Sequence, residues 1–240
     1  MSETSLSEED QSKKGCGVLN QKHSQPADIE KTSMAIIEAE LQEKGVVLPE
    51  ETAAVVKRVI HTTADFEYVE NLYFSKGAVK MTAKPLKENA VIVTDTNMAK
   101  AGISKVALQK LDGAVYCFMA DDEGAAKAKE TGSTRAAASM EKSAELYPAA
   151  VFAVGNAPTA LLKLCELMEN GLRPALVIGV PVGFVNVVDS KERLIEICEK
   201  YSVPVLVARG RKGGSNIAAA VCNALLYTAA DMLDPVARGW

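Results

Sequence analysis

The sequence has few aromatic residues and few cysteines. Aromatic residues make up 5% of the 240 residues, and the five cysteines form no CxxC pair. An odd number of cysteines without that spacing predicts neither a zinc site nor a disulfide framework. Four of them lie inside apolar segments and are interpreted as reduced thiols of the core: Cys117, Cys165, Cys198 and Cys222.

Long apolar runs and an excess of positive charge are also missing. No apolar stretch approaches the ~20 residues that span a bilayer, and the start of the chain lacks the basic and apolar regions of a secretion signal. The net charge of −4, with no basic stripe, argues against non-specific binding of nucleic acid. We expect a cytoplasmic protein with no membrane or nucleic-acid partner.

The common nucleotide and hydrolase motifs are absent as well. The sequence contains neither GxxxxGK[ST] nor GxGxxG, so ATP, GTP and NAD(P) lose their usual support. It also contains neither GxSxG nor HExxH. Any catalytic group has to be found by other features.

Three apolar runs in the last ninety residues each stop at a glycine-rich or charged turn, and a helix-type segment follows. The turns begin at Gly155, Gly179 and Arg209. In an open parallel sheet such turns lie at the carboxyl edge, where doubly wound folds bind their ligands. Three turns that line one crevice predict a sizeable ligand with several acidic groups.

Strand-type and helix-type segments alternate along most of the chain. Strands are predicted over 90–93, 114–119, 150–154, 175–178 and 203–208, and helices over 28–45, 49–61, 78–88 (interrupted near Pro85), 124–146, 157–170, 190–201 and 215–233. The segment 68–74 fits either a short strand or a helical turn. The predicted fold is an α/β three-layer sandwich: a doubly wound, mostly parallel sheet of about five strands with a helical N-terminal cap. Residues 1–25 are predicted to be a disordered polar tail and 26–240 a single domain.

The loop that follows the last strand is cationic. Arg209, Arg211 and Lys212 precede Gly213, Gly214 and Ser215, where a helix starts. Helix N-termini and glycine-rich turns bind anions because their free N–H groups point outward. A solvated turn is the alternative, but three cations would then crowd one another, so we favour an anion site. Arg135 also opens a helix and suits a carboxylate.

Three other positions could carry chemistry. His61 is one of two histidines, and an imidazole both holds and releases a proton near neutrality. From spacing alone, a helix residue packed beside its apolar neighbours is the favoured interpretation. Asp95 follows a strand and could accept a hydrogen bond or a proton, or cap the next helix. Gly155 allows a ligand to approach the backbone closely, and Asn156 could cap the helix or donate a hydrogen bond.

Seven segments, taken in order, resemble the precorrin-8X methylmutases (cobalt-precorrin-8 methylmutases) of cobalamin biosynthesis. They are IEKTSMAII (29–37), RVIH (58–61), DTNMAKAGI (95–103), GSTRAA (132–137), VGNAPTAL (154–161), PVGFVN (181–186) and RGRKGGS (209–215). No single segment is diagnostic, but seven in the same order, spread over roughly Pro26 to Leu226, are highly specific.

The resemblance implies an isomerase that moves a methyl group from C-11 to C-12 of the precorrin macrocycle. It implies a homodimer, no separate organic cofactor, no metal site of the protein, and cobalt, if present, carried within the substrate. The family's catalytic histidine falls on His61, which would protonate a ring nitrogen. The residues expected to bind the corrinoid substrate are Ser33, Asp95, Met98, Arg135, Gly155, Asn156, Gly183, Phe184, Arg209, Arg211, Gly213, Gly214 and Ser215.

Two other classes of function are compatible with the architecture. A non-catalytic corrinoid-binding or carrier protein would use the same crevice but would have no use for a titrating group at His61. A phosphosugar or nucleotide transferase would need a phosphate-plus-metal constellation, and no pair of acidic residues is spaced for Mg²⁺. The ordered segments favour the isomerase.

Overall fold

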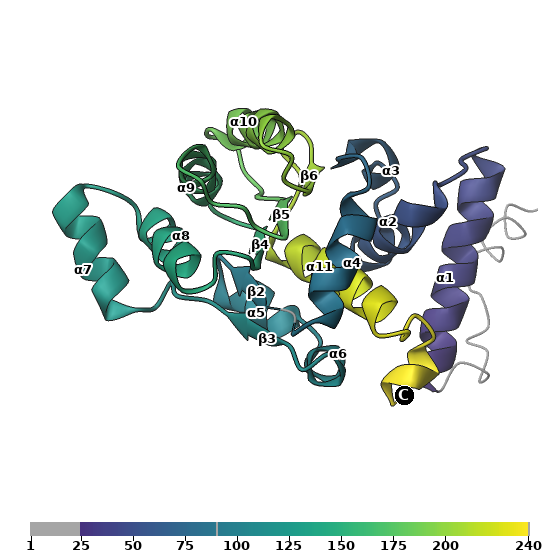
Figure 1. Ribbon diagram of the computed structural model, residues 1–240. Coiled ribbons are helices and arrows are strands. Elements are labelled where there is room, and N and C mark those ends of the chain that lie inside the picture. The colour runs from purple at the N-terminus through teal and green to yellow at the C-terminus, as the bar shows by residue number, and fades with distance from the viewer. Residues whose placement is uncertain (1–24, 90, 240) are drawn as a thin grey trace, which may run out of the picture.

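The computed structural model describes residues 25–89 and 91–239. The predicted polar tail, residues 1–25, lies outside the described residues except for Gln25, which precedes the first helix. A six-stranded sheet forms the middle layer, and helices cover both of its faces (Figure 1). The predicted three-layer α/β sandwich is therefore confirmed.

The sheet has one strand more than predicted. Its strands are β1 (Leu72–Phe74), β2 (Val91–Thr94), β3 (Ala114–Tyr116), β4 (Val151–Val154), β5 (Leu176–Gly179) and β6 (Val205–Ala208). Their order is β1-β6-β5-β4-β2-β3, and in the described sheet β1 alone runs antiparallel to its neighbour. The segment 68–74 contains both alternatives, because the helical turn α3 (Tyr68–Asn71) leads directly into β1.

Apolar side chains that alternate along the buried strands hold the two helix layers to the sheet. Ile92 and Leu206 belong to the core on one face, and Val93, Phe152 and Val207 belong to the core on the other. The first face carries α2 (Glu50–Thr63), α4 (Ala78–Lys87), α5 (Asn97–Gly102), α6 (Lys105–Lys110) and α11 (Ser215–Ala229). The second carries α8 (Arg135–Leu146), α9 (Pro158–Glu169) and α10 (Val187–Lys200), with α7 (Asp122–Thr131) packed on α8.

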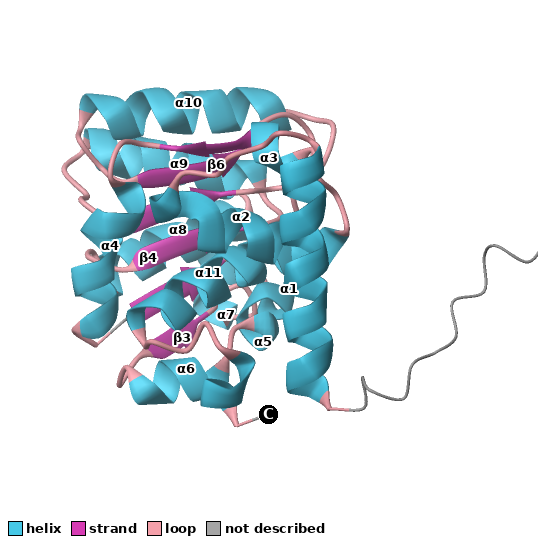
Figure 2. Cartoon of the chain, turned by 90° about the vertical axis from the view of Figure 1, so that its right-hand side faces the viewer, coloured by secondary structure: helices cyan, strands magenta, loops and turns pink. Residues whose placement is uncertain are grey.

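The first helix lies outside these layers. α1 (Pro26–Glu43) packs on α2 and on the 3-10 helix η2 (Pro235–Arg238), as the predicted N-terminal cap would (Figures 1 and 2). α11 is the central helix of its face, and most of its residues are buried. Among the described residues, no helix is long and apolar enough to cross a membrane.

Three helix predictions need correction. The helix expected over 124–146 is two helices, because Gly132 at φ 66° ends α7 and Thr134 accepts the N–H of Ala137 to cap α8. The short helices α5 and α6 between β2 and β3 were not predicted. α4 is not interrupted at Pro85 but continues to Lys87.

The order of the strands defines where a ligand is expected. From β2 the chain moves to β3 on one side, whereas from β4 it moves through β5 to β6 on the other. The direction therefore switches between β2 and β4. In doubly wound folds, ligands bind outside the carboxyl ends of the strands at such a switch point.

Candidate active site

Five loop segments meet at the carboxyl ends of the strands. They are 94–98 after β2, 132–135 before α8, 155–159 after β4, 181–186 after β5 and 209–215 after β6. We call the surface that they form the carboxyl-edge surface. Hydrogen bonds between side chains join four of them in two pairs: Thr134 contacts Thr159 at 2.9 Å between hydroxyl oxygens, and Thr96 contacts Ser215 at 2.7 Å.

Asp95 follows β2 and holds the loop that follows β4, on the other side of the switch point. Its carboxylate accepts the N–H groups of Gly155, Asn156 and Ala157, each at 2.8 Å, and its side chain is fully buried. Burial raises the pKa of Asp95, and the three N–H donors oppose this shift without cancelling it. Asp95 therefore ties β2 to the β4 loop. Its carboxylate supports the carboxyl-edge surface and has no exposed area of its own with which to contact a ligand.

Glycine is required where the loops touch one another. A Cβ on Gly155 would come within 2.8 Å of the Gly214 carbonyl oxygen and the Ser215 Cα. Gly213, at φ 157°, would place a Cβ onto the Val180 carbonyl. The first turn of α11 is thereby held directly against the start of the β4 loop.

The β5 and β6 loops are joined by their backbones. The N–H of Gly183 donates to the Arg211 carbonyl at 3.2 Å, and the N–H of Gly214 donates to the Val180 carbonyl at 2.8 Å. Phe184 is 82% exposed, and the Arg211 guanidinium lies 5.4 Å from the centre of its ring. An aromatic face and a cation are thus presented side by side on the carboxyl-edge surface.

The crowding argument for three loop cations is wrong, because two of them have carboxylate partners. Lys212 Nζ lies 2.5 Å from Asp65 Oδ2 and 2.7 Å from Glu67 Oε2, and both carboxylates raise its pKa. Arg209 Nε lies 3.6 Å from Glu192 Oε1, and the guanidinium stacks on the Tyr73 ring. Within the described residues Arg211 has no carboxylate partner.

His61 lies in the last turn of α2, close to the point where α2 is fastened to the β6 loop. Asp65, one turn further along the chain, forms the ion pair with Lys212. The His61 side chain is half-buried, and no side chain in the described part of the chain hydrogen-bonds to its ring. Burial lowers the pKa of His61, and the nearby Arg58 lowers it further. The imidazole of the ligand-free protein is therefore mostly neutral at pH 7.

A buried charged cluster lies beside His61. One carboxylate oxygen of Glu30 accepts from Arg58 and from Arg238, each at 2.6 Å, and both guanidinium groups lie over the Tyr227 ring. The cluster joins α1, α2, α11 and η2. The charges of the cluster act on His61, whose pKa is lowered by Arg58 and Arg238 and raised by Glu30.

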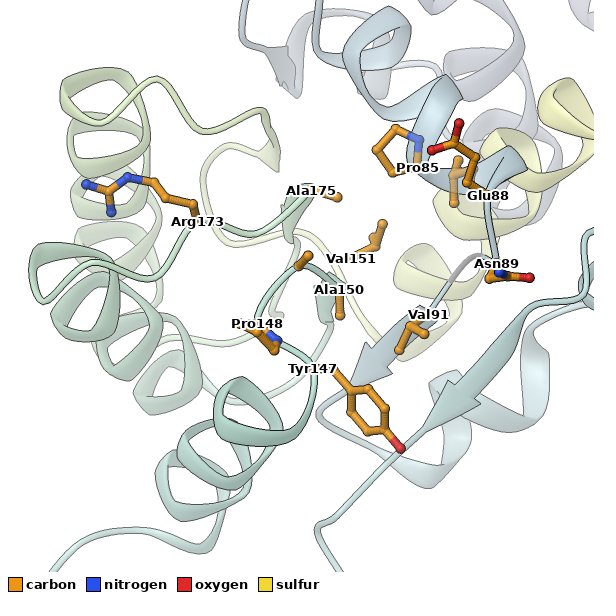
Figure 3. Close-up of a pocket in the computed structure, with 12 residues that line it drawn as sticks. Pro85, Glu88, Asn89, Val91, Tyr147, Pro148, Ala150, Val151, Arg173 and Ala175 are labelled. Carbon is orange, nitrogen blue, oxygen red and sulfur yellow. The ribbon is translucent and has the colours of Figure 1, made fainter.

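The opposite edge of the sheet holds a cavity of about 500 Å³ (Figure 3). Apolar side chains such as Pro85, Val91 and Ala150 line most of it. Its arginine, Arg173, donates to the carbonyls of Met168 and Leu172. None of the predicted site residues lines this cavity.

The protein-family comparison identifies the chain. Residues 28–228 match the family model for precorrin-8X methylmutase. The chain belongs to this family. A member of it is an isomerase, so the enzyme hypothesis is confirmed over the carrier and the transferase.

Individual family members are similar over most of the chain. The cobalt-precorrin-8 methylmutase of Salmonella typhimurium is 43% identical over 175 residues, which are 72% of this chain and 80% of that protein. The precorrin-8X methylmutase of Pseudomonas aeruginosa is 38% identical over 198 residues, 82% and 93% of the two chains. The crystal structure of the precorrin-8X methylmutase from Thermus thermophilus matches with a TM-score of 0.75 at 40% identity, covering 85% of this chain and 98% of the other.

The remaining predicted residues of this methylmutase lie on α1, α5 and α8 and in the loops after β5 and β6. Arg135 and Met98 are exposed on the carboxyl-edge surface, Met98 by 72%. Ser33 lies on α1, one turn after Glu30, and its hydroxyl donates to the Ile29 carbonyl. Gly183, Phe184, Arg209, Arg211, Gly213, Gly214 and Ser215 lie in the β5 and β6 loops. The role of each as a substrate contact stays a prediction.

Sequence analysis missed residues that hold the loops and helices around the carboxyl-edge surface in place. Thr96, Glu30 and Lys191 were not singled out. The Thr96 hydroxyl forms the hydrogen bond with Ser215, and it also accepts the N–H of Ala99, which caps α5. A Thr directly after a strand and before a helix is an N-cap signal that could have identified it. Among the described residues, no group of three or more His, Cys, Asp or Glu side chains could hold a metal ion.

Proposed function

We propose that this enzyme moves a methyl group from C-11 to C-12 of precorrin-8 or cobalt-precorrin-8, giving hydrogenobyrinic or cobyrinic acid in cobalamin biosynthesis. The observation that carries the proposal is the gathering of five family-type segments, distant in sequence, on the carboxyl-edge surface. The other two segments, on α1 and α2, carry Ser33 and His61.

The migration is intramolecular, so the bond to C-11 breaks as the bond to C-12 forms and no methyl acceptor is needed. The protein has to supply a proton donor and a shape that fits the transition state. His61 is the donor, and a macrocycle nitrogen receives its proton. Because the pKa of His61 is lowered, its imidazolium form is a stronger acid than a free imidazolium. The carboxylates of the bound substrate raise this pKa, so that His61 is protonated in the complex.

The carboxylates of the macrocycle fix its position. Arg211 and Arg135 are exposed cations, and the first N–H groups of α11 have no partner within their own helix. Arg209 reaches a carboxylate by exchanging its long contact with Glu192. Several separate anchors suit a ligand with many acetate and propionate groups better than a single phosphate.

The assembly and the cofactor requirement are part of the same proposal. We expect a homodimer and no separate organic cofactor. Sedimentation of the purified protein measures the first, and turnover in a buffer without added cofactor measures the second.

The test is conversion of precorrin-8, with and without cobalt, by the purified protein. Relatives carry both substrate names, so both forms are needed. A change of the visible spectrum and the position of a ¹³C-labelled methyl group, followed by NMR, report the shift to C-12. Tight binding of both compounds without migration of the label to C-12 would refute the proposed methyl shift. Absence of binding to either compound would refute the corrinoid assignment.

A further inference from the structure

Lys191 is a fully buried lysine on α10. Its side chain has 0% exposure, and its ammonium donates to the carbonyls of Gly210 at 2.8 Å and Lys212 at 2.9 Å. A buried ammonium is costly unless polar groups surround it. In the described chain its hydrogen-bond partners are two carbonyls of the β6 loop, and no carboxylate forms an ion pair with it.

The β6 loop is therefore held at three successive carbonyls. The Gly210 and Lys212 carbonyls meet Lys191, and the Arg211 carbonyl between them accepts the N–H of Gly183. The backbone cannot rotate at these peptides without breaking one of the three bonds. The exposed Arg211 side chain departs from the middle of this fastened segment.

We propose that Lys191 is a positioning residue, which fixes the β6 loop so that Arg211 and the N–H groups at the start of α11 face a carboxylate of the ligand. The identity of the ligand rests on the proposed function, whereas the fastening of the loop does not.

A lysine serves this purpose better than an apolar residue because it satisfies both carbonyls with one charged group. Burial lowers the pKa of Lys191 to about 8, and Glu192 opposes the shift. On the facing loop Arg209 pairs with Glu192 and Lys212 with Asp65 and Glu67; on α9, Glu169 pairs with Arg193 of α10. Above pH 8 the neutral amine keeps hydrogen bonds to the carbonyls but loses their charge assistance.

The test compares Lys191→Met with Lys200→Met, an exposed lysine at the end of the same helix. The first readout needs no ligand: the rate of trypsin cleavage after Arg209, Arg211 and Lys212, measured beside the melting temperature. We expect cleavage in this loop to be at least about fivefold faster in Lys191→Met, with cleavage elsewhere and the melting temperature unchanged. Lys200→Met should match the wild type.

The second readout is the affinity for hydrogenobyrinic acid, followed by visible absorption. For Lys191→Met we expect a Kd for hydrogenobyrinic acid raised about tenfold. At saturating precorrin-8, kcat should stay within about threefold of the wild type. From pH 7 to pH 9 the Kd of both proteins should rise as His61 loses its proton, and the wild-type Kd should rise about threefold more than that of the variant. Because the unfolded chain binds more protons in this range, loss of the Lys191 charge increases folding stability as affinity falls. If the substitution only destabilised the fold, folding stability and affinity would fall together.

Unchanged loop cleavage together with an unchanged Kd in Lys191→Met would overturn the proposal. So would a lowered melting temperature with faster cleavage along the whole chain, because Lys191 would then serve folding alone. If the wild type does not bind hydrogenobyrinic acid, the proposed function fails, and the cleavage rates still decide whether Lys191 fastens the loop.

Discussion

The two edges of the sheet differ in what they offer a ligand. The amino edge has a roomy, mostly apolar cavity of about 500 Å³, and the arginine in its lining is engaged by backbone carbonyls. The carboxyl edge has exposed cations, glycine turns and His61 near its rim. Helices that follow parallel strands start at the carboxyl edge and end at the amino edge. The positive ends of the helix dipoles therefore lie at the carboxyl edge and the negative ends at the amino edge. Chemistry, more than hollow volume, marks the site of an anionic substrate.

The largest expected effect comes from His61→Ala. Removing the proposed proton donor should lower kcat by about 10² to 10⁴-fold, the usual contribution of a general acid. The Kd for product should stay within about tenfold, or 1.4 kcal/mol. Steady-state turnover and an absorption titration measure the two. Asn89→Ala, at the amino-edge cavity, is the control, and equal losses of kcat in both variants would show that catalysis does not depend on the carboxyl edge in particular.

The pH dependence of turnover should report on His61, which is the one histidine in the described part of the chain. In the proposed reaction the protonated imidazole is the active form, and in the ligand-free protein its pKa lies below 6.5. We expect kcat/KM to fall about tenfold per pH unit above that pKa. The limb in kcat should lie at higher pH, since substrate carboxylates raise the pKa in the complex. A His61→Gln variant that retains the same limb would show that another group titrates.

Asp95→Asn tests whether the carboxyl edge depends on its buried support. The amide cannot accept all three N–H groups that Asp95 accepts, which should lower the free energy of unfolding by about 1–3 kcal/mol. We expect weaker product binding by about tenfold as the 155–157 loop loosens. Asp112→Asn, in an exposed turn at φ 48° before β3, is the matched control and should be neutral. Denaturant unfolding of both variants is the measurement.

Removal of single loop cations should have a smaller, salt-dependent effect. Arg211→Gln should weaken product binding about fivefold at low salt and less at high salt. Arg209→Gln should lose less, because Arg209 already contacts Glu192. Arg173→Gln removes the same charge at the amino edge. An equal loss there would mean that overall charge, rather than the carboxyl-edge surface, attracts the substrate.

The smallest effect is expected from filling the amino-edge cavity. Ala149→Leu adds apolar volume at an exposed position of its lining and should leave kcat and KM within about twofold. Turnover assays decide this. A large rise in KM would show that the amino edge also binds the substrate.

The fold was predictable where the periodic signal is long. Buried strands such as β4, and helices of twelve residues or more, stand out from their apolar pattern. α5 and α6 have six residues each, which is under two turns and too short to show a period. The pairing of β1 with β6 joins residues more than 130 apart, and nothing local in a three-residue strand specifies it.

The site was predictable as a set of loops but not as a network. Asp95 was singled out, yet its three N–H bonds to the β4 loop follow only from the order of the strands. The partners of Lys212 and Arg209 lie on other elements, so their charges looked uncompensated along the chain. Lys191 sits in the polar stretch DSKER, which is typical of a solvated helix face, and its full burial has no local signal.

The buried charged cluster at Glu30 affects the order in which the parts of the molecule fold. Arg238 lies 208 residues downstream of Glu30, and β1 likewise waits for β6. A chain that emerges from the ribosome amino end first has made α1 and α2 long before their partners exist. The parallel strands β2 to β5 can pair in the meantime. The layer that carries His61 would then be the last to form, so a nascent chain would not hold His61 in its final position until Arg238 had been synthesised.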